Sequence, residues 1–216
     1  MSSIDRRAVR LASWLAATGA LALSLASAPG RAQDADLSAR DARNTAIAVC
    51  GTCHGPDGNS TNPMFPRLAG QRAWYIEEEL KAFRSETRGD PYAVAYMWGM
   101  ASGLSDATIT ALAEYFAHQK PGRGEPGSAA ALTEGKRIYE HGIPAQGLPA
   151  CAVCHGPEAL GDAMHPRLAG QHAEYIMKQL GSFKDNMRNV AVMHGVAGTL
   201  HDAQMEAVAQ YLQSLP

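Results

Sequence analysis

The sequence lacks three things: spare cysteines, runs of basic residues, and a second long apolar stretch. Its four cysteines all fall within two short segments, residues 50–54 and 151–155. Its 19 Lys and Arg are set against 21 Asp and Glu, with no basic cluster. A chain without clustered positive charge is a poor candidate for binding nucleic acid or anionic membranes. Only residues 11–28 approach the roughly 20 apolar residues needed to span a bilayer.

The first 32 residues have the pattern of a secretory signal peptide. Three arginines lie in residues 1–10, and an apolar run rich in small residues follows. A membrane anchor is the alternative interpretation, but the small residues favour cleavage, which we expect after Ala32. The predicted mature protein is soluble and periplasmic. Its 15 basic and 20 acidic residues predict partners that present positive charge, and loose membrane association stays open.

The two cysteine-containing segments share the pattern C-x-x-C-H. This is the local signature of covalent c-type haem attachment, in which two thiols bond the porphyrin and the imidazole ligates the iron. The predicted attachment and proximal residues are Cys50, Cys53 and His54 in the first segment, and Cys151, Cys154 and His155 in the second.

Two alternatives can explain four cysteines in an exported chain. Structural disulfides would scatter the cysteines so as to link distant loops, whereas these form two tight pairs. A four-thiolate zinc site would leave the adjacent histidines without a role. We therefore predict two covalently bound haem c groups.

Each haem motif opens one copy of an internal repeat. Residues 66–71 and 166–171 are both Pro-Arg-Leu-Ala-Gly-Gln, at an offset of 100, and the haem motifs are offset by 101. The sequence therefore predicts two tandem domains, residues 33–120 and 128–216, joined by a Pro/Gly-rich linker over residues 121–127. Haem would complete the small apolar core of each domain.

Both copies predict an all-α domain. Apolar spacing indicates helices at about residues 38–50 and 71–83, with a loop at 55–66 between them. Along the second helix, residues 77–79 are expected on the face opposite the apolar one. Ser105 is predicted to cap a last helix that buries Ile109, Leu112, Ala113 and Phe116. The second copy predicts helices at about 128–140 and 202–215.

The sixth iron ligand must occur in both copies. Met97 and Met193 lie far enough past the motifs for a helix to carry the chain to the opposite haem face. Met64 and Met164 follow the histidines too closely, and we interpret them as packing at the haem edge. We predict Met97 and Met193 as ligands, which would favour the reduced iron and suit an electron carrier.

Two other residues compete for the sixth position. His194 lies beside Met193, but its counterpart is Trp98, which cannot ligate iron. Met100 is a second rival, and its counterpart is Val196. The remaining histidines have no histidine counterpart, so surface or packing roles are expected for His118, His141, His165, His172 and His201.

Duplicated C-x-x-C-H units, each followed by P-R-L-A-G-Q, Y-I, M-x-G and a closing helix, resemble the dihaem cytochrome c4 family. The resemblance covers essentially the whole mature chain and implies two class I cytochrome c domains about an approximate two-fold axis. It also implies His/Met ligation of both irons, and proximal histidines held by the carbonyls of Pro66 and Pro166. Family members carry electrons from a quinol-oxidising cytochrome bc complex, or another donor, to a terminal oxidase.

Three functions remain to be distinguished. The first is an electron carrier that is not itself an enzyme. The second is the cytochrome subunit of a flavocytochrome c sulfide dehydrogenase, which requires a flavoprotein partner. The third is a dihaem peroxidase-like enzyme, which needs an open iron site, whereas both copies offer the same downstream methionine.

Overall fold

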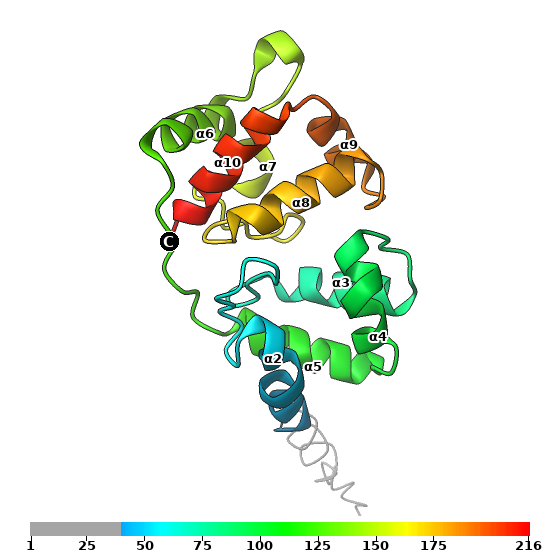
Figure 1. Ribbon diagram of the computed structural model, residues 1–216. Helices are drawn as coiled ribbons and strands as arrows, with labels where there is room; N and C mark the ends of the chain where they lie inside the picture. The colour runs from blue at the N-terminus through cyan, green and yellow to red at the C-terminus, as the bar shows by residue number, and fades with distance from the viewer. Residues whose placement is uncertain (1–39) are drawn as a thin grey trace, which may run out of the picture.

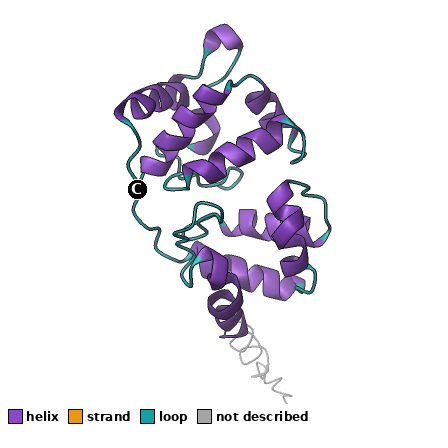
Figure 2. Cartoon of the chain, in the orientation of Figure 1, coloured by secondary structure: helices purple, strands orange, loops and turns teal. Residues whose placement is uncertain are grey.

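A computed structural model describes residues 40–216, which fold into two helical domains arranged one above the other (Figure 1). The predicted signal peptide, residues 1–32, lies outside the described residues. Figure 2 shows helices joined by loops; within residues 40–216 the only β-pairing is an isolated bridge between Ile143 and Leu148. None of the helices in this range is long and apolar enough to cross a membrane.

The first domain is built from helices on both sides of the haem motif. Residues 40–45 are helical and continue into η1 (Ala46–Cys50), a π-helical stretch, and α2 (Gly51–His54). The remaining elements are α3 (Ala73–Arg84), η2 (Ala93–Met97), α4 (Trp98–Ala101) and α5 (Asp106–Ala117).

The second domain repeats this order with two differences. Its elements are α6 (Ala129–His141), η3 (Pro144–Gln146), α7 (Ala152–His155), α8 (Ala173–Lys184), α9 (Ala191–Gly198) and α10 (Asp202–Ser214). A loop separates α6 from the haem motif, and the methionine segment is one α-helix rather than a π-helix followed by an α-helix.

The predicted last helix of the first domain is confirmed. Ser105 caps α5, its side chain accepting from the Thr108 N–H at 3.2 Å. The predicted apolar stripe of α5 is buried: it consists of Ile109, Leu112, Ala113 and Phe116.

The first helix differs from the prediction because it does not stop at Cys50 but runs through the motif to His54. In the second domain α6 ends at Gly142, whose φ of 65° is left-handed. A Cβ on Gly142 would lie 2.2 Å from the Leu148 carbonyl, so the turn requires glycine there. The first domain has no glycine just before its motif, and its helix continues.

Each domain has its own apolar core, and the predicted haem residues border it. In the first domain Cys50 packs against a cluster that includes Leu112 and Phe116, and Met97 against a cluster around Phe83. In the second domain Cys151 and Met193 border one larger cluster. In the second domain one core therefore fixes both the attachment segment and the methionine segment, whereas in the first domain two separate clusters fix them.

The segment between the domains is not a free tether. It contains no helix between Ala117 and Ala129, as expected from its Pro and Gly content. However, the Gly122 N–H donates to Asn59 Oδ1 at 2.6 Å, and Glu125 N–H donates to the Gln213 carbonyl at 3.1 Å. Both ends of the segment are therefore tied to the domains that they connect.

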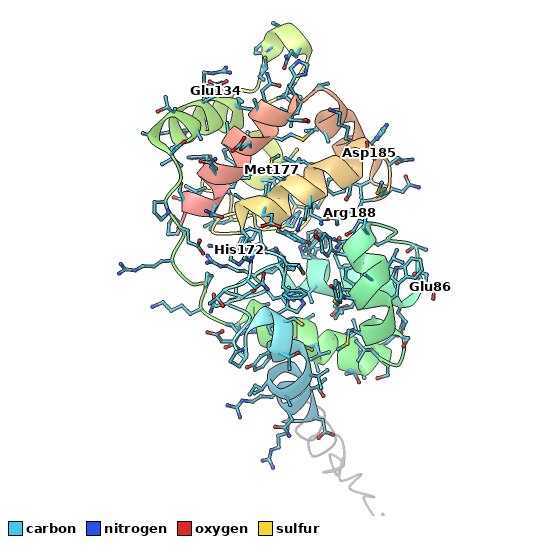
Figure 3. The ribbon with its side chains drawn as sticks, in the orientation of Figure 1. Glu86, Glu134, His172, Met177, Asp185 and Arg188 are labelled. Atoms are coloured by element: carbon cyan, nitrogen blue, oxygen red, sulfur yellow. The ribbon has the colours of Figure 1, made fainter. Side chains whose placement is uncertain are left out.

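Helices α3 and α8 face each other across the domain boundary (Figure 1). Glu79 of α3 was expected on the polar outer face, and the structure corrects this: its carboxylate binds Arg88 at 2.5 Å and also binds Arg188 of the second domain. Arg188 lies at the boundary in Figure 3. The Glu79 side chain is only 17% exposed, because a second domain covers the face that a single helix would turn to water.

The interdomain cluster follows the internal repeat but is not symmetric in charge. Arg88 and Arg188 are equivalent positions, and each guanidinium stacks on the phenylalanine of its own domain. The equivalent of Glu79 is Gln179, whose Oε1 accepts from both arginines, at 2.8 and 2.9 Å. One carboxylate and one amide thus bridge the same two buried cations, and Asp90 binds Arg88 at 2.6 Å.

Candidate haem sites

The motif cysteines lie on one helical turn in each domain, three residues apart, so their thiols share a helix face. All four are free thiols. Within residues 40–216 no group of three or more potential metal-ligating side chains comes together, so a four-thiolate zinc site is not assembled. Burial raises the pKa of Cys50 and raises that of Cys151 to about 11, so both thiols are protonated at neutral pH.

The motif histidines are buried, each held through one ring nitrogen. Nδ1 of His54 lies 2.9 Å from the Pro66 carbonyl, and Nδ1 of His155 lies 3.0 Å from the Pro166 carbonyl. Because a carbonyl only accepts, Nδ1 carries the proton and Nε2 is the nitrogen with a lone pair. The family resemblance implies that the Pro66 and Pro166 carbonyls hold the two histidines, and these distances are those of such hydrogen bonds.

Burial keeps these rings neutral. It lowers the pKa of His54 and of His155, and in each case the proline carbonyl opposes the shift without reversing it. A neutral imidazole with a free Nε2 is the form that ligates iron. Both histidines therefore have the protonation state and the available Nε2 that ligation of a haem iron requires.

The loop after each motif is folded back so that the proline meets the histidine. In the first domain the Gly58 carbonyl accepts from the Leu68 and Ala69 N–H groups, at 2.7 and 3.1 Å. In the second, the Ala159 carbonyl accepts from the two equivalent N–H groups at 2.8 and 3.0 Å. These paired bonds hold the start of the Pro-Arg-Leu-Ala-Gly-Gln segment against the motif.

Met97 and Met193 are both half-buried, and each packs against an apolar cluster of its own domain. Met97 closes η2 and packs beside Phe83, while Met193 lies in α9 against the second core. In the first domain the Phe65 ring contacts both His54 and Tyr96, with centroid distances of 6.1 and 5.8 Å. This row of rings brings the segment that carries Met97 alongside the loop that follows His54.

The rivals for the sixth position are differently placed. His194 holds its Nδ1 2.8 Å from the Phe183 carbonyl, and its counterpart Trp98 donates to the Arg88 carbonyl at 2.8 Å. Both residues therefore anchor the methionine segment to the chain before it, His194 to the last turn of α8 and Trp98 to the connection that follows α3. Met100 is 47% exposed.

Large apolar side chains are exposed on the segments that carry the predicted haem residues. Val153 of the second motif is 80% exposed, and Val192, beside Met193, is 70% exposed. Met164, predicted to pack at the haem edge, is 74% exposed. Tyr96 is 47% exposed. Exposed apolar surface is typical of a binding site, and here it lies on the same segments as the cysteines and methionines predicted to hold the haems.

The other histidines divide as expected between surface and packing. His118, His141 and His201 are exposed, and His165 is half-buried and binds Asp162 at 3.0 Å. His172 is the packing histidine: it is fully buried where the domains meet (Figure 3), with Nε2 2.9 Å from the Ser60 carbonyl of the first domain.

The buried His172 predicts an acid-sensitive domain contact. Burial lowers the pKa of His172 most, with a smaller lowering from Arg67, while Ser60, Glu125 and Glu174 oppose the shift. Its contribution to stability is present above the unfolded pKa of about 6.5 and is lost as pH falls through the folded pKa. Urea unfolding of wild type and His172→Gln at pH 7.5 and 5.0 checks this. We expect the wild type to lose more stability; equal losses would show that His172 does not titrate with folding.

Sequence reasoning missed the residues that join the two domains. Arg88 and Arg188 pair with residues of the opposite domain, and Gln71 and Gln171 do so through the backbone. Each pair is related by the repeat at an offset of 100. A polar residue that is kept in both copies but has no role at the haem could have indicated a contact between the domains.

Comparisons with known proteins agree with this geometry. The cytochrome c family model matches residues 41–120 and again residues 132–216. Cytochrome c4 of Azotobacter vinelandii is 39% identical, over 78% of this chain and 85% of the relative. A protein of Thiomonas intermedia named thiosulfate dehydrogenase electron acceptor is 42% identical, over 78% of this chain and 79% of its own length.

A solved structure gives the same result for the fold. Reduced recombinant cytochrome c4 from Pseudomonas stutzeri superposes with a TM-score of 0.74 at 37% identity, covering 82% of this chain and 98% of that one. Two matched domains, two C-x-x-C-H motifs and relatives of this kind indicate two covalent haem c groups. The chain therefore belongs to the cytochrome c family, as a dihaem electron-transfer protein of the cytochrome c4 type and not an enzyme.

Proposed function

We propose that this protein is a periplasmic carrier of single electrons in a respiratory chain, with each haem held in the same way. The proposed thioether-forming residues are Cys50, Cys53, Cys151 and Cys154. The proposed iron ligands are His54 with Met97 in the first domain, and His155 with Met193 in the second.

The observation that carries the proposal is that both domains supply the same two candidate ligands. Each has a buried histidine with its Nδ1 engaged, and each has a half-buried methionine bordering the core. An iron with two ligands from the protein has no open position for oxygen or peroxide, and its haem supplies only the one-electron iron couple. The buried histidine and the methionine of each domain would hold the iron from the protein, and the haem would supply the one-electron chemistry.

The partners follow from this role. We propose a quinol-oxidising cytochrome bc complex as electron donor and a terminal oxidase as acceptor, both reached in the periplasm after removal of residues 1–32. The acidic mature chain favours partners with positive charge at the docking site.

A second donor is supported by a specific relative. The Thiomonas intermedia protein is named for accepting electrons from thiosulfate dehydrogenase. An enzyme that oxidises a sulfur compound is therefore the alternative donor. The flavocytochrome c sulfide dehydrogenase subunit stays a separate prediction, which requires a flavoprotein that co-purifies with this chain.

Stopped-flow mixing tests the proposal. The oxidised dihaem protein is mixed with a reduced bc complex or with thiosulfate dehydrogenase plus thiosulfate, and the haem absorbance is followed. We expect rapid reduction of both haems by one of these donors, with a rate that falls as salt rises because charged surfaces steer the encounter. No reduction by either, or steady consumption of added peroxide, would contradict an electron carrier.

A further inference from the structure

One peptide group connects each motif histidine to the opposite domain. The carbonyl of Pro66 lies 2.9 Å from His54 Nδ1, and the N–H on the other side of that same peptide bond belongs to Arg67. This Arg67 N–H donates to Oε1 of Gln171, in the second domain, at 2.8 Å. The peptide between Pro66 and Arg67 therefore accepts from a ring of its own domain and donates to a side chain of the other.

The second domain has the mirrored arrangement. The Pro166 carbonyl lies 3.0 Å from His155 Nδ1, and the Arg167 N–H donates to Oε1 of Gln71 at 2.8 Å. The bonds run in both directions across the boundary, as an approximate two-fold axis requires.

The glutamine amides are fixed in orientation. Nε2 of Gln171 donates to the Arg67 carbonyl at 2.9 Å, so one amide grips both the N–H and the C=O of a single residue. Gln71 grips Arg167 in the same way, at 2.8 and 2.9 Å. Both glutamines are only 8% exposed, so water does not compete freely for these bonds. Swapping O and N would place like groups together, and each amide has one good orientation.

We infer that Gln71 and Gln171 are positioning residues that tune the reduction potential of the haem in the opposite domain, each acting through one peptide group. The inference rests on the proposed ligation of iron by His54 and His155. Gln171 acts on the haem of the first domain, and Gln71 acts on the haem of the second.

The physical basis is the polarisation of hydrogen-bonded chains. A peptide whose N–H donates to a buried acceptor has a more negative carbonyl oxygen, because linked hydrogen bonds strengthen one another. That oxygen then binds the imidazole Nδ1–H more strongly and makes the ring a more basic ligand. A more basic ligand favours the oxidised iron, so each glutamine lowers the potential of the haem that it reaches.

The crossed assignment gives a test that a merely structural role would not pass. Gln171→Leu removes the acceptor from Arg67 N–H and should raise the potential of the first haem. Gln71→Leu should raise that of the second. The equilibrium constant for electron exchange between the two haems should change about two- to fivefold, in opposite directions in the two variants. A change of this size corresponds to a fraction of the free energy of one hydrogen bond. Redox titration followed by NMR of the haem methyl groups in the intact dihaem protein separates the two haems.

Two further measurements keep the test decisive. In the reduced protein, the NMR signal of the His54 Nδ1 proton should move upfield in Gln171→Leu and stay in place in Gln71→Leu. Trp74→Phe is the matched control: it removes another interdomain bond, from Trp74 Nε1 to the Asp162 carbonyl at 3.1 Å, without touching either peptide. In Trp74→Phe the equilibrium constant for electron exchange between the haems should stay near the wild-type value.

The outcomes are separable. Equal shifts of both haems, or a shift of the haem in the mutated domain itself, would overturn the inference and leave only a role in docking the domains. Electron paramagnetic resonance of the same samples reports ligation independently. If both irons are low-spin but neither glutamine variant shifts the potential of the haem in the opposite domain, only the effect of the glutamines is rejected. A high-spin iron in the wild type would instead reject the proposed ligation.

Discussion

Glu79→Leu is expected to destabilise the protein by about 3–5 kcal/mol, since removing one partner of a buried ion pair leaves uncompensated charge. Glu79 is the carboxylate shared by Arg88 and Arg188, whose side chains are only 7% and 5% exposed. In the variant, Asp90 still pairs with Arg88, but Arg188 keeps only neutral partners. Chemical unfolding of the dihaem protein, followed by tryptophan fluorescence and haem absorbance, measures the loss.

The neighbouring carboxylate supplies the control for this prediction. Glu78 is exposed on the same helix, and Glu78→Leu should change the unfolding free energy by no more than about 0.5 kcal/mol. If both variants lost the same small amount, the buried cluster would not stabilise the domain contact.

Acid should weaken the same contact. Burial alone would raise the pKa of Glu79, but attraction from Arg88 and Arg188 outweighs it and lowers the pKa. A carboxylate with a lowered folded pKa stabilises above its unfolded pKa of about 4.3, and that contribution disappears as pH falls through the folded value. The acid transition should therefore be less steep in Glu79→Leu than in the wild type.

Gly135→Ala is expected to destabilise the second domain by about 3 kcal/mol, the upper range for inserting a methyl group into a packed contact. Helices α6 and α10 cross in the second domain (Figure 1), and Gly135 lies in the middle of α6. A Cβ there would lie 2.0 Å from the Ala207 carbonyl oxygen and 2.7 Å from Tyr211 Cβ. The nearest atoms belong to the backbone of α10, so the helices must move apart.

The matched control is a second helical glycine with free space around it. Apart from its chain neighbours and the nearby backbone of α8 itself, no atom lies within 4 Å of a Cβ added to Gly181, and its counterpart in the repeat, Lys81, is exposed. Gly181→Ala should stabilise by up to about 1 kcal/mol through helix propensity. Thermal unfolding of both variants decides the matter: a stable Gly135→Ala protein would show that the helix crossing tolerates a wider spacing.

Local patterns predicted the helices because local chemistry determines them. Ser105 caps α5 as expected, and the stripe from Ile109 to Phe116 is buried, since a capping hydroxyl and a 3.6-residue period act within one helix. The motif spacing likewise predicts His54 and His155 as ligands, and the structure holds both rings on the proline carbonyls that the family resemblance implies.

Contacts between domains escaped the sequence because periodicity shows which face of a helix is polar but not what covers that face. Glu79 fits the pattern of a solvated residue, yet it lies between two arginines, one from each domain. Gln71 and Gln171 looked like part of a family signature. Their partners lie 96 and 104 residues away, and no local rule links such positions.

The central claim, two irons each ligated by His and Met, is tested most directly by electron paramagnetic resonance of the oxidised dihaem protein. Two low-spin signals are predicted for the wild type. Met97→Ala should convert only the first haem to high spin and Met193→Ala only the second, whereas Met100→Leu should leave both unchanged. A high-spin iron in the wild type, or a methionine variant that keeps both low-spin signals, would contradict the account.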